Sequence, residues 1–183
     1  ADLNELDLDA AALRRDFTIN ALYFDPETGT LHDALDGAAD LEARILRHCS
    51  PRFAEDPLRI LRGVQLAARF ELTAAPETLA FCRSLSLEGI APERLFEEWR
   101  KLLVLGQTPS LGLQFLRGSG GLRFFPELEA LVGCAQDPAF HPEGDVWVHT
   151  LHALDAAARA RSNDRREDLV VALAVLAHDF GKP

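Results

Sequence analysis

The sequence predicts a mainly α-helical protein of the α+β class, with a small α/β portion at its N-terminal end. Helical and extended signals alternate over residues 1–50, whereas apolar residues after Pro51 recur with the 3.6-residue period of amphipathic helices. A chain of 183 residues with 48% hydrophobic residues can bury a core, as one domain or two small ones.

The first 50 residues are typical of the trailing part of an α/β domain whose first strands lie upstream. A turn at residues 25–29, Asp-Pro-Glu-Thr-Gly, predicts a hairpin between the extended segments on either side of it. The predicted segments are, in order, a helix over 8–21, extended segments over 21–24 and 30–32, a helix over 38–43 and a strand over 45–49.

The rest of the chain is predicted to be helical, over residues 57–70, 76–85, 92–105, a short segment that starts at 124–126, 145–160 and 168–180. In the first of these helices one stripe is apolar, formed by Ile60, Leu61, Val64, Ala67 and Ala68. In the helix over 92–105 we expect the inward side chains to be Leu95, Phe96, Trp99, Leu102 and Leu103. Glu97 and Lys101 are spaced as a favourable ion pair there.

Composition excludes several classes of protein. The longest apolar run, residues 169–177, is far shorter than the roughly 20 residues that span a membrane. The N-terminus carries acidic residues (Asp2, Glu5, Asp7, Asp9) rather than a signal peptide, and Cys49, Cys82 and Cys134 form no metal-binding pattern. We therefore expect a reduced, cytoplasmic protein. Because the sequence contains no methionine, we also expect a fragment of a longer chain.

Charge is segregated along the sequence. The net charge of −10 argues against nucleic-acid binding over the whole surface. Residues 44–69, however, contain six arginines against two acidic residues. On a helix, Arg59, Arg62, Gln65 and Arg69 share the face opposite the apolar stripe, and three guanidinium groups there suit a triphosphate.

Asp56 precedes Pro57 at the start of this helix, as an N-cap residue does. A carboxylate and a guanidinium also match the Watson–Crick edges of cytosine and adenine, which pair an amino donor with a ring-nitrogen acceptor. Guanine and uracil present the opposite pattern and would leave both protein groups unpaired. Asp56 and Arg59 are therefore candidates for selecting C and A.

These motifs resemble the class II tRNA nucleotidyltransferases, the CCA-adding enzymes and bacterial poly(A) polymerases. Residues 14–21 (Arg-Arg-Asp-Phe-Thr-Ile-Asn-Ala) resemble the family motif that binds sugar and phosphates, and residues 55–59 (Glu-Asp-Pro-Leu-Arg) resemble the base-reading motif. The resemblance implies nucleotide binding by Arg15 at the phosphates, Asp16 at the ribose, Asp56 and Arg59 at the base, and Arg62 at the triphosphate. Gln65 departs from the family, in which many members have a third arginine.

The resemblance also implies a division into three parts. Asp36-Gly37 and Asp40-Leu41 resemble the family's hinge motif, and residues 92–101 resemble its neck motif, which we interpret as structural. We expect the end of a nucleotidyltransferase head domain over 1–50, a helical neck that binds base and RNA over 51–140, and the start of an HD domain over 141–183.

The catalytic centre that the resemblance implies is not recognisable in this sequence. Family members hold two Mg²⁺ ions with an Asp-x-Asp pair that follows a glycine-rich turn. Asp7 and Asp9 have that spacing but lack the turn, so we interpret them as the acidic start of a helix. We expect the catalytic pair upstream of Ala1 and this chain alone to be inactive in nucleotide transfer.

The C-terminal histidines resemble the opening of an HD domain, a helical metal-dependent phosphohydrolase module. The motif residues are His141 with Glu143, then His149, then His178 with Asp179. The resemblance implies a divalent metal bound by His149, His178 and Asp179, with the last family ligand downstream. We expect a structural role for His152.

The function that the resemblance implies is addition of C and/or A to tRNA 3′ ends from CTP and ATP, without a nucleic-acid template. The expected partners are tRNA, CTP and ATP, with no membrane. An HD domain after the neck favours CCA-type enzymes over poly(A) polymerases. The alternatives are a poly(A) polymerase, an HD phosphohydrolase with a non-catalytic nucleotide- or RNA-binding region, and a non-enzymatic RNA- or nucleotide-binding module.

Overall fold

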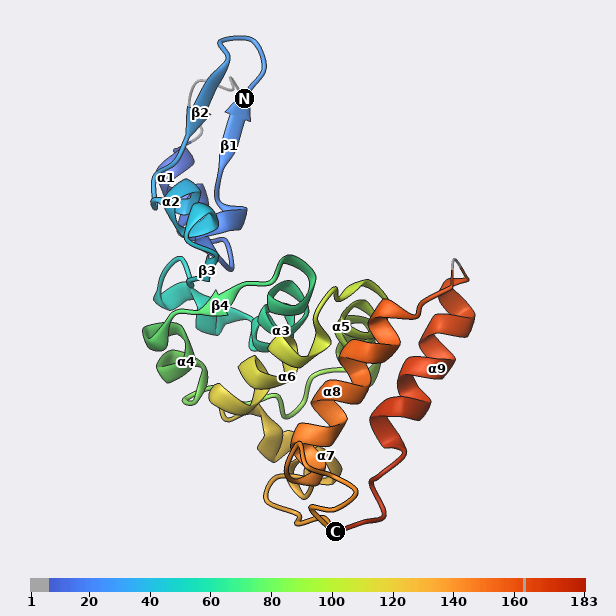
Figure 1. Ribbon diagram of the computed structural model, residues 1–183. Helices are drawn as coiled ribbons and strands as arrows, with labels where there is room; N and C mark the ends of the chain where they lie inside the picture. Colours follow the sequence, from blue (N-terminus) through green and yellow to red (C-terminus); the bar gives the residue numbers. More distant parts are fainter. Residues whose placement is uncertain (1–6, 163) are drawn as a thin grey trace.

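The computed structural model describes residues 7–162 and 164–183, which form an N-terminal arm above a helical body (Figure 1). Asp2 and Glu5 of the acidic start lie outside the described residues. The architecture is mainly helical with two small sheets, which confirms the predicted α+β class.

The arm contains two short helices, a 3₁₀ turn and the predicted hairpin. Its elements are α1 (Leu8–Ala12), η2 (Thr18–Asn20), β1 (Tyr23–Asp25), β2 (Thr30–His32), α2 (Gly37–Glu42) and β3 (Ile45–Leu46). β1 and β2 pair antiparallel with Phe24 opposite Leu31, as the turn chemistry predicts. Asp25 stabilises the turn, because its carboxylate accepts hydrogen bonds from the amide of Glu27 and the hydroxyl of Thr28.

The predicted helix over 8–21 is wrong beyond Ala12. There the backbone turns away to pair with a distant segment: Thr18 N donates to Arg47 O at 2.9 Å, and Cys49 N donates to Asp16 O at 3.1 Å. These contacts replace the hydrogen bonds of a continued helix. Strand β3 has only two residues, shorter than the predicted 45–49, and the Phe17–His48 pair beyond it is an isolated bridge.

The body begins with η3 (Pro51–Glu55), and its strand β4 (Thr73–Ala74) pairs parallel with β3, which joins arm and body. The helices of the body are α3 (Arg59–Phe70), α4 (Pro76–Cys82), α5 (Pro92–Leu105), α6 (Pro109–Gly118), η4 (Gly121–Phe124), α7 (Pro126–Glu129), α8 (Val146–Arg159) and α9 (Arg165–Ala177). Helix α9 begins and ends three residues before its predicted limits. Asp164 sets this start, since its side chain accepts from the amides of Arg166 and Glu167.

Helix α3 lies at the centre of the body, packed against α5 and α6. All five residues of its predicted apolar stripe are buried. The prediction for α5 is wrong at Phe96, which is 49% exposed. The predicted Glu97–Lys101 pair is also wrong, because Glu97 pairs with Arg100 at 2.7 Å and Glu98 pairs with Lys101 at 2.8 Å, both three residues apart.

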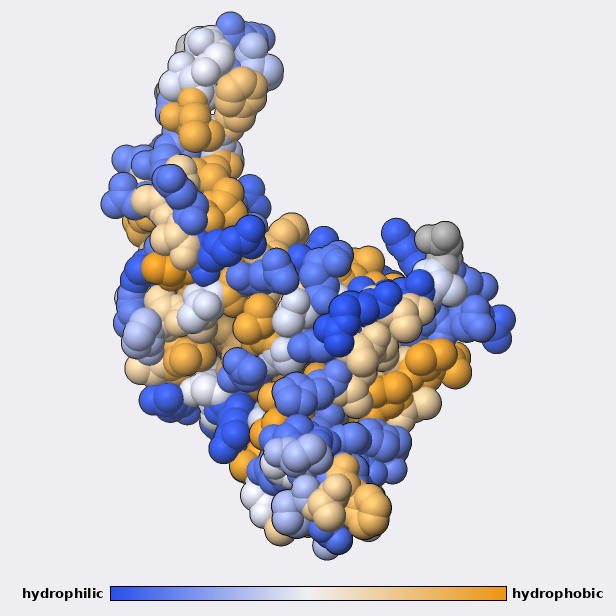
Figure 2. Space-filling view, viewed as in Figure 1, coloured by the Kyte–Doolittle hydropathy of each residue, from blue (hydrophilic) through white to orange (hydrophobic). Residues whose placement is uncertain are grey.

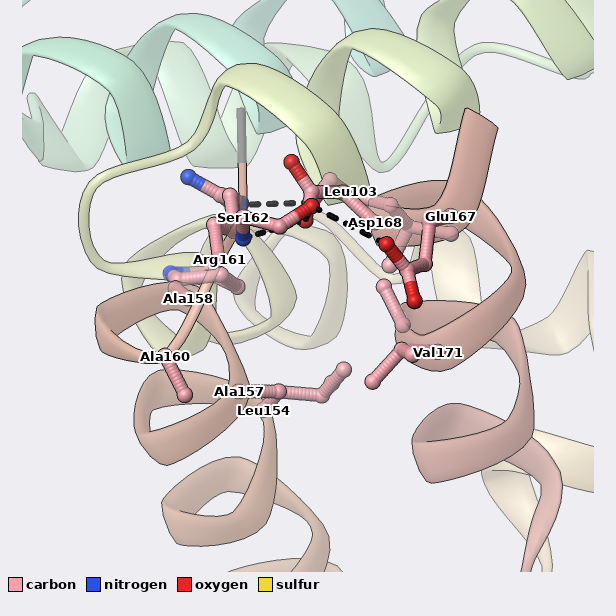
Figure 3. Close-up of a pocket in the computed structure, with 12 residues that line it drawn as sticks. Leu103, Leu154, Ala157, Ala158, Ala160, Arg161, Ser162, Glu167, Asp168 and Val171 are labelled. Atoms are coloured by element: carbon pink, nitrogen blue, oxygen red, sulfur yellow. Dashed lines mark hydrogen bonds between the residues drawn. The ribbon is translucent and has the colours of Figure 1, made fainter. Parts of the chain in front are cut away.

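A small cavity of about 150 Å³ lies where the α8–α9 connection meets the end of α5 (Figure 3). Its polar groups satisfy each other. Arg161 donates to the carbonyls of Leu103 and Gly106, and Asp168 accepts from the amide and hydroxyl of Ser162. We interpret this cavity as a structural junction between helices.

Hydrophobic side chains also remain on the surface. On α9, Val170, Val171 and Leu173 are exposed, and Figure 2 shows hydrophobic residues on this side of the molecule. Within the described residues, no helix combines the length and apolar character needed to cross a membrane. The three cysteines are free thiols, and burial raises the pKa of both Cys49 and Cys82 to about 12.

The close approach of α6 to α3 and α5 depends on Gly112. A Cβ atom at this position would lie 2.6 Å from Val64 O and 2.7 Å from Leu102 Cδ1. In an open helix, replacing glycine by alanine stabilises by about 1 kcal/mol. For Gly112→Ala we expect the opposite, a fall of about 1–3 kcal/mol in the free energy of unfolding, because the helices must separate. Urea denaturation followed by circular dichroism measures it.

Gly181→Ala is the matched control, because a Cβ at Gly181 meets nothing within 4 Å. Equal stability of the Gly112→Ala chain and the unsubstituted chain would contradict this account of the packing.

Candidate functional site

A groove between α3 and α5 collects charged residues from both helices. Its volume is about 510 Å³. Four of its side chains are cationic and two are carboxylates, although the whole protein carries a net charge of −10. The lining residues are Asn20, Asp56, Leu58, Arg62, Gln65, Leu66, Arg69, Arg94, Glu98 and Lys101. A local excess of positive charge in a concave site suits an anionic ligand.

Asp56 lies in this groove, held by a turn and by α5. Its Oδ1 accepts from Leu58 N at 3.2 Å, and its Oδ2 accepts from Arg94 Nη2 at 2.9 Å. The predicted N-cap role needs correction, because α3 begins at Arg59 with Leu58 at the N-cap position. Asp56 instead stabilises the turn that leads into the helix.

Arg59 is directed away from Asp56, toward the arm. Its guanidinium donates to Arg52 O at 2.9 Å and to Arg14 O at 2.7 Å, and it lies over the ring of Phe53. Among the described residues, the groove is lined by Asp56 and not by Arg59. The two predicted base-reading residues, three positions apart in the sequence, therefore lie in different environments.

Asp16 and Arg62 connect the arm to the groove. Asp16 is buried, and its Oδ1 accepts from Phe17 N and from the side-chain amide of Asn20. Arg62 Nη2 lies 2.9 Å from Asp16 Oδ2 as an ion pair, although no donor among the described residues is aligned with this oxygen for a hydrogen bond. Arg15 is exposed, with its guanidinium 5.6 Å from the centre of the Tyr23 ring.

The hinge residue Asp40 belongs to the same region but not to the groove. It is buried and accepts from Thr18 Oγ1 at 2.7 Å and from Arg47 Nε at 3.1 and 3.2 Å. These contacts connect α2, η2 and the segment after β3, so Asp40 stabilises the arm.

The contribution of α5 to the groove was not predicted from the sequence. Arg94, Glu98 and Lys101 are four and three residues apart, which places them on one face of a helix. This spacing is the feature of the sequence from which their shared face could have been predicted. Glu98 is 6% exposed and pairs with Lys101 through Oε1, and its Oε2 has no hydrogen-bond partner within residues 7–162 and 164–183. On α3, Gln65 is buried and accepts from Arg69.

The predicted metal ligands come together at the opposite end of the body, where the end of α9 meets the start of α8. One ligand atom from each of His149, His178 and Asp179 lies within 4.8 Å of the others. His178 Nε2 is 3.3 Å from Asp179 Oδ2, and the rings of His149 and His178 are 5.3 Å apart. His152 is exposed on α8 and does not belong to this group.

Asp179 is a buried carboxylate with one nearby cation. Lys182 Nζ lies 2.8 Å from its Oδ2 and also donates to Gln136 Oε1 at 2.6 Å. Burial raises the pKa of Asp179, but Lys182 and the nearby His178 outweigh this effect and lower the pKa overall. No aligned hydrogen bond reaches Oδ2 from the part of the chain that the structure describes. An oxygen in this state suits a cation.

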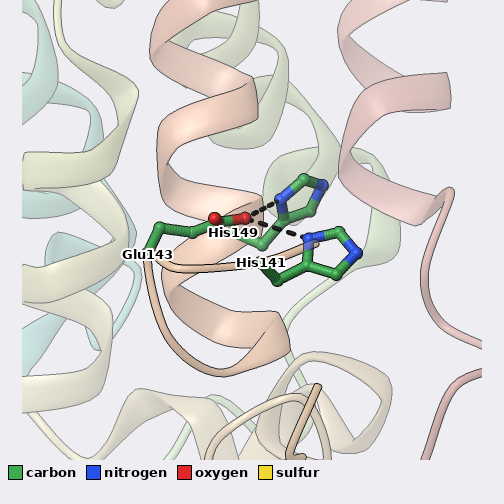
Figure 4. Close-up of side chains that lie close together, drawn as sticks. All are labelled: His141, Glu143 and His149. Carbon is green, nitrogen blue, oxygen red and sulfur yellow. Dashed lines mark hydrogen bonds and ion pairs between the residues drawn. The ribbon is translucent and has the colours of Figure 1, made fainter. Parts of the chain in front are cut away.

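Glu143 belongs to the predicted histidine motif, but no contact was predicted for it from the sequence. Its Oε1 lies 2.6 Å from His149 Nδ1 and 3.1 Å from His141 Nδ1 (Figure 4). A backbone hydrogen bond, followed by these two histidines, lowers the pKa of Glu143 to about 2. The sequence signal was the spacing of His141 and Glu143, two residues apart in the loop before α8.

Asp7 is the N-cap residue of α1, since its Oδ1 accepts from Ala10 N at 3.0 Å, and Asp9 lies in the first turn. This confirms the interpretation of the two aspartates as the acidic start of a helix.

Comparisons with known proteins agree with the predicted family. Residues 2–47 match the family described as "Poly A polymerase head domain", and residues 71–131 match the one described as "Probable RNA and SrmB- binding site of polymerase A". A "Multifunctional CCA protein" of Alkalilimnicola ehrlichii is 47% identical over 97% of this chain and 43% of its own length. The protein of the same name from Pseudomonas fluorescens is 46% identical over 97% of this chain and 44% of its own length.

Solved structures show the same fold. A tRNA-processing enzyme in its apo form superposes with a TM-score of 0.65 at 26% identity, over 96% of this chain and 50% of that one. A Thermotoga maritima CCA-adding enzyme, solved in complex with tRNA, superposes with a TM-score of 0.62 at 22% identity, over 93% of this chain and 41% of that one.

The chain spans less than half of the length of the curated relatives described here. Its family matches, its relatives and its fold agree with one another, and the chain belongs to the CCA-adding and poly(A) polymerase family of nucleotidyltransferases.

Proposed function

We propose that this chain is the nucleotide- and RNA-binding part of an enzyme that adds C and/or A to tRNA 3′ ends from CTP and ATP, without a nucleic-acid template. The observation that carries the proposal is the cationic groove, which contains Asp56 and Arg62 in a chain 47% identical to a CCA protein. The division proposed is a head domain to residue 50, a neck to residue 140 and an HD domain beyond it. The proposed location is the cytoplasm.

Within the groove, Arg62 and its cationic neighbours Arg69 and Lys101 suit the phosphates of a nucleotide. Asp56 is held in place by Arg94 and can accept from the exocyclic amino group of cytosine or adenine. Glu98 Oε2, buried and without a partner among the described residues, is a further acceptor for a ligand hydroxyl or amino group.

Three of the proposed contacts require side chains to move. Arg59 must exchange the carbonyls of Arg52 and Arg14 for the base, and Arg15 must leave the ring of Tyr23 for the phosphates. Asp16 must reach the ribose from its buried position beside Arg62. Magnesium is the proposed cofactor of transfer, where it would stabilise the charge that develops on the phosphates.

Base selection can be tested by binding, without the transfer reaction. We expect the 183-residue chain to bind CTP and ATP more tightly than UTP and GTP in isothermal titration calorimetry. Asp56→Ala removes the acceptor for the amino group, so the preference should fall by about 1–3 kcal/mol, the cost of an unpaired buried polar group. Asp56→Asn keeps an oxygen for Leu58 N but offers an amide donor to uracil, so it should relax the preference with little change in melting temperature.

Glu55→Ala is the matched control, because Glu55 is the exposed neighbour and pairs with Arg52. If both Asp56 variants keep the preference of the unsubstituted chain, Asp56 is a structural residue of the turn and the base-reading proposal is wrong.

A second activity, metal-dependent phosphoester hydrolysis, is favoured by the histidine cluster. The donor set of two imidazoles and a buried carboxylate suits a divalent metal. His178 Nε2 and Asp179 Oδ2 are 3.3 Å apart. This is close to the distance between two neighbouring ligand atoms that are each bound to one metal ion at roughly 2.1 Å. A metal held here would lower the pKa of a bound water molecule for hydrolysis. We propose His149, His178 and Asp179 as its ligands.

The metal site is tested by titrating the chain with Co²⁺ and following binding by calorimetry. If His149, His178 and Asp179 are the only protein ligands, we expect weak binding, since water fills the remaining positions. We expect His178→Ala to reduce the affinity at least about tenfold. His152→Ala, a histidine of α8 outside the cluster, should leave the affinity unchanged. Equal affinity of the His178→Ala chain and the unsubstituted chain would remove His178 from the site.

A further inference from the structure

Glu143, His141 and His149 form a hydrogen-bonded group next to the proposed metal ligands. One carboxylate oxygen, Glu143 Oε1, contacts Nδ1 of both imidazoles, at 2.6 Å for His149 and 3.1 Å for His141. The group is partly buried, in the loop before α8 and on the first turns of that helix. Figure 4 shows the second nitrogen of each ring on the side away from Glu143.

The groups that face these rings determine which ring nitrogen carries the hydrogen. A carboxylate at neutral pH can only accept hydrogen bonds, so each Nδ1 facing Glu143 must carry the hydrogen. His178 also has its hydrogen on Nδ1, because Nδ1 lies 2.6 Å from the carbonyl oxygen of Val175, which can only accept. Its Nε2 lies 3.3 Å from Asp179 Oδ2 but makes no aligned hydrogen bond to that oxygen. In a neutral imidazole with the hydrogen on Nδ1, the lone pair is on Nε2. Three neighbouring histidines therefore present Nε2 as the nitrogen that can bind a metal.

The ring of His149 lies close to the rings of both His141 and His178. The ring centres are 4.9 Å apart for His141 and His149 and 5.3 Å apart for His149 and His178. Imidazoles bound through Nε2 to one ion, with bonds of roughly 2.1 Å, have their centres roughly 5 Å apart. Two groups with ligand atoms within 4.8 Å share His149: one contains His141 and Glu143, the other His178 and Asp179. Because neither group of the described residues contains both His141 and His178, His141 must move closer to His178 and Asp179 to bind the same ion.

We infer that Glu143 is a positioning residue that holds His149 and His141 with Nε2 free, and that His141 is an additional ligand of the metal bound by His149, His178 and Asp179. The inference rests on the proposed metal-dependent phosphohydrolase site. Outer carboxylates that accept from the second nitrogen of a ligating histidine orient the ring and fix its tautomer. Glu143 has this geometry toward two rings at once.

The positioning role is tested in the metal-free 183-residue chain by long-range ¹H–¹⁵N NMR of the imidazole rings, which distinguishes the protonated nitrogen from the one with the lone pair. We expect the hydrogen on Nδ1 of His141, His149 and His178. In Glu143→Ala, His141 and His149 should shift toward the Nε2–H form. His178 should not change, because its Nδ1 contacts Val175, and it serves as an internal control.

Glu143→Gln is the conservative variant, because its amide oxygen can still accept from Nδ1. We expect it to keep the Nδ1–H form, at least at His149. Doubly protonated rings in the unsubstituted chain, or unchanged tautomers in Glu143→Ala, would overturn the positioning role.

The ligand role is tested by Co²⁺ affinity in calorimetry and by the visible absorption of bound Co²⁺, which reports its coordination. We expect His141→Ala and Glu143→Ala each to lower the affinity by about 10- to 100-fold, with Glu143→Gln close to the unsubstituted chain. His141→Ala should also change the absorption of the bound ion, whereas His152→Ala should change neither quantity. Melting temperatures establish that each variant is folded.

The outcomes separate the inference from the function on which it rests. Normal affinity and absorption in His141→Ala would remove His141 from the ligand set while the proposed site stands. A loss in Glu143→Gln as large as in Glu143→Ala would make Glu143 a ligand and overturn its positioning role. If the unsubstituted chain binds no Co²⁺, the metal site and the ligand role of His141 both fail, and the NMR comparison still decides the role of Glu143.

Discussion

Helix α3 determines both the core of the body and the position of the groove. One side of the helix packs on α5 and α6 through aliphatic and small side chains, and Gly112 of α6 allows backbone and side chains to approach closely. The other side carries Arg62, Gln65 and Arg69. Because α5 is fixed against α3, its own polar face meets these residues across the groove. The apolar packing of α3 on α5 thus sets the distance between the polar side chains of the two helices across the groove, although these side chains are not part of that packing.

The parts of the fold that could be predicted are those whose signal is local. The buried stripe of α3 follows from its 3.6-residue period, and the hairpin follows from the turn at residues 25–29. The helix predicted over 8–21 was wrong because residues 16–18 pair with residues 47–49, and such a distant contact leaves no periodic trace. The prediction that Phe96 faces inward was wrong because apolar character alone does not show which side of α5 is covered by other helices.

In the candidate sites, too, only the features with a local sequence signal could be predicted. Residues that belong to recognisable motifs, such as Asp56 and His149, could be identified in the sequence. Their partners could not, since Arg94 reaches Asp56 from a helix 38 residues away and Glu143 contacts His149 from a loop. Which arginine meets which carboxylate is decided by helix packing. For that reason Asp56 is paired with Arg94, although Arg59 is nearer in the sequence.

Lys182 gives the histidine cluster a property that the proposed ligands alone would not have. Its ammonium group lies beside Asp179 and is held there by Gln136. The buried carboxylate therefore has a counter-ion supplied by the chain itself, so charge balance at the end of α9 does not depend on a metal. A metal ion bound to Asp179 Oδ2 at the proposed site would displace this ammonium group, and the free energy of that displacement would be subtracted from the binding free energy. Metal binding at the proposed site would therefore be an exchange of cations, in which the metal ion replaces the ammonium group of Lys182 beside Asp179.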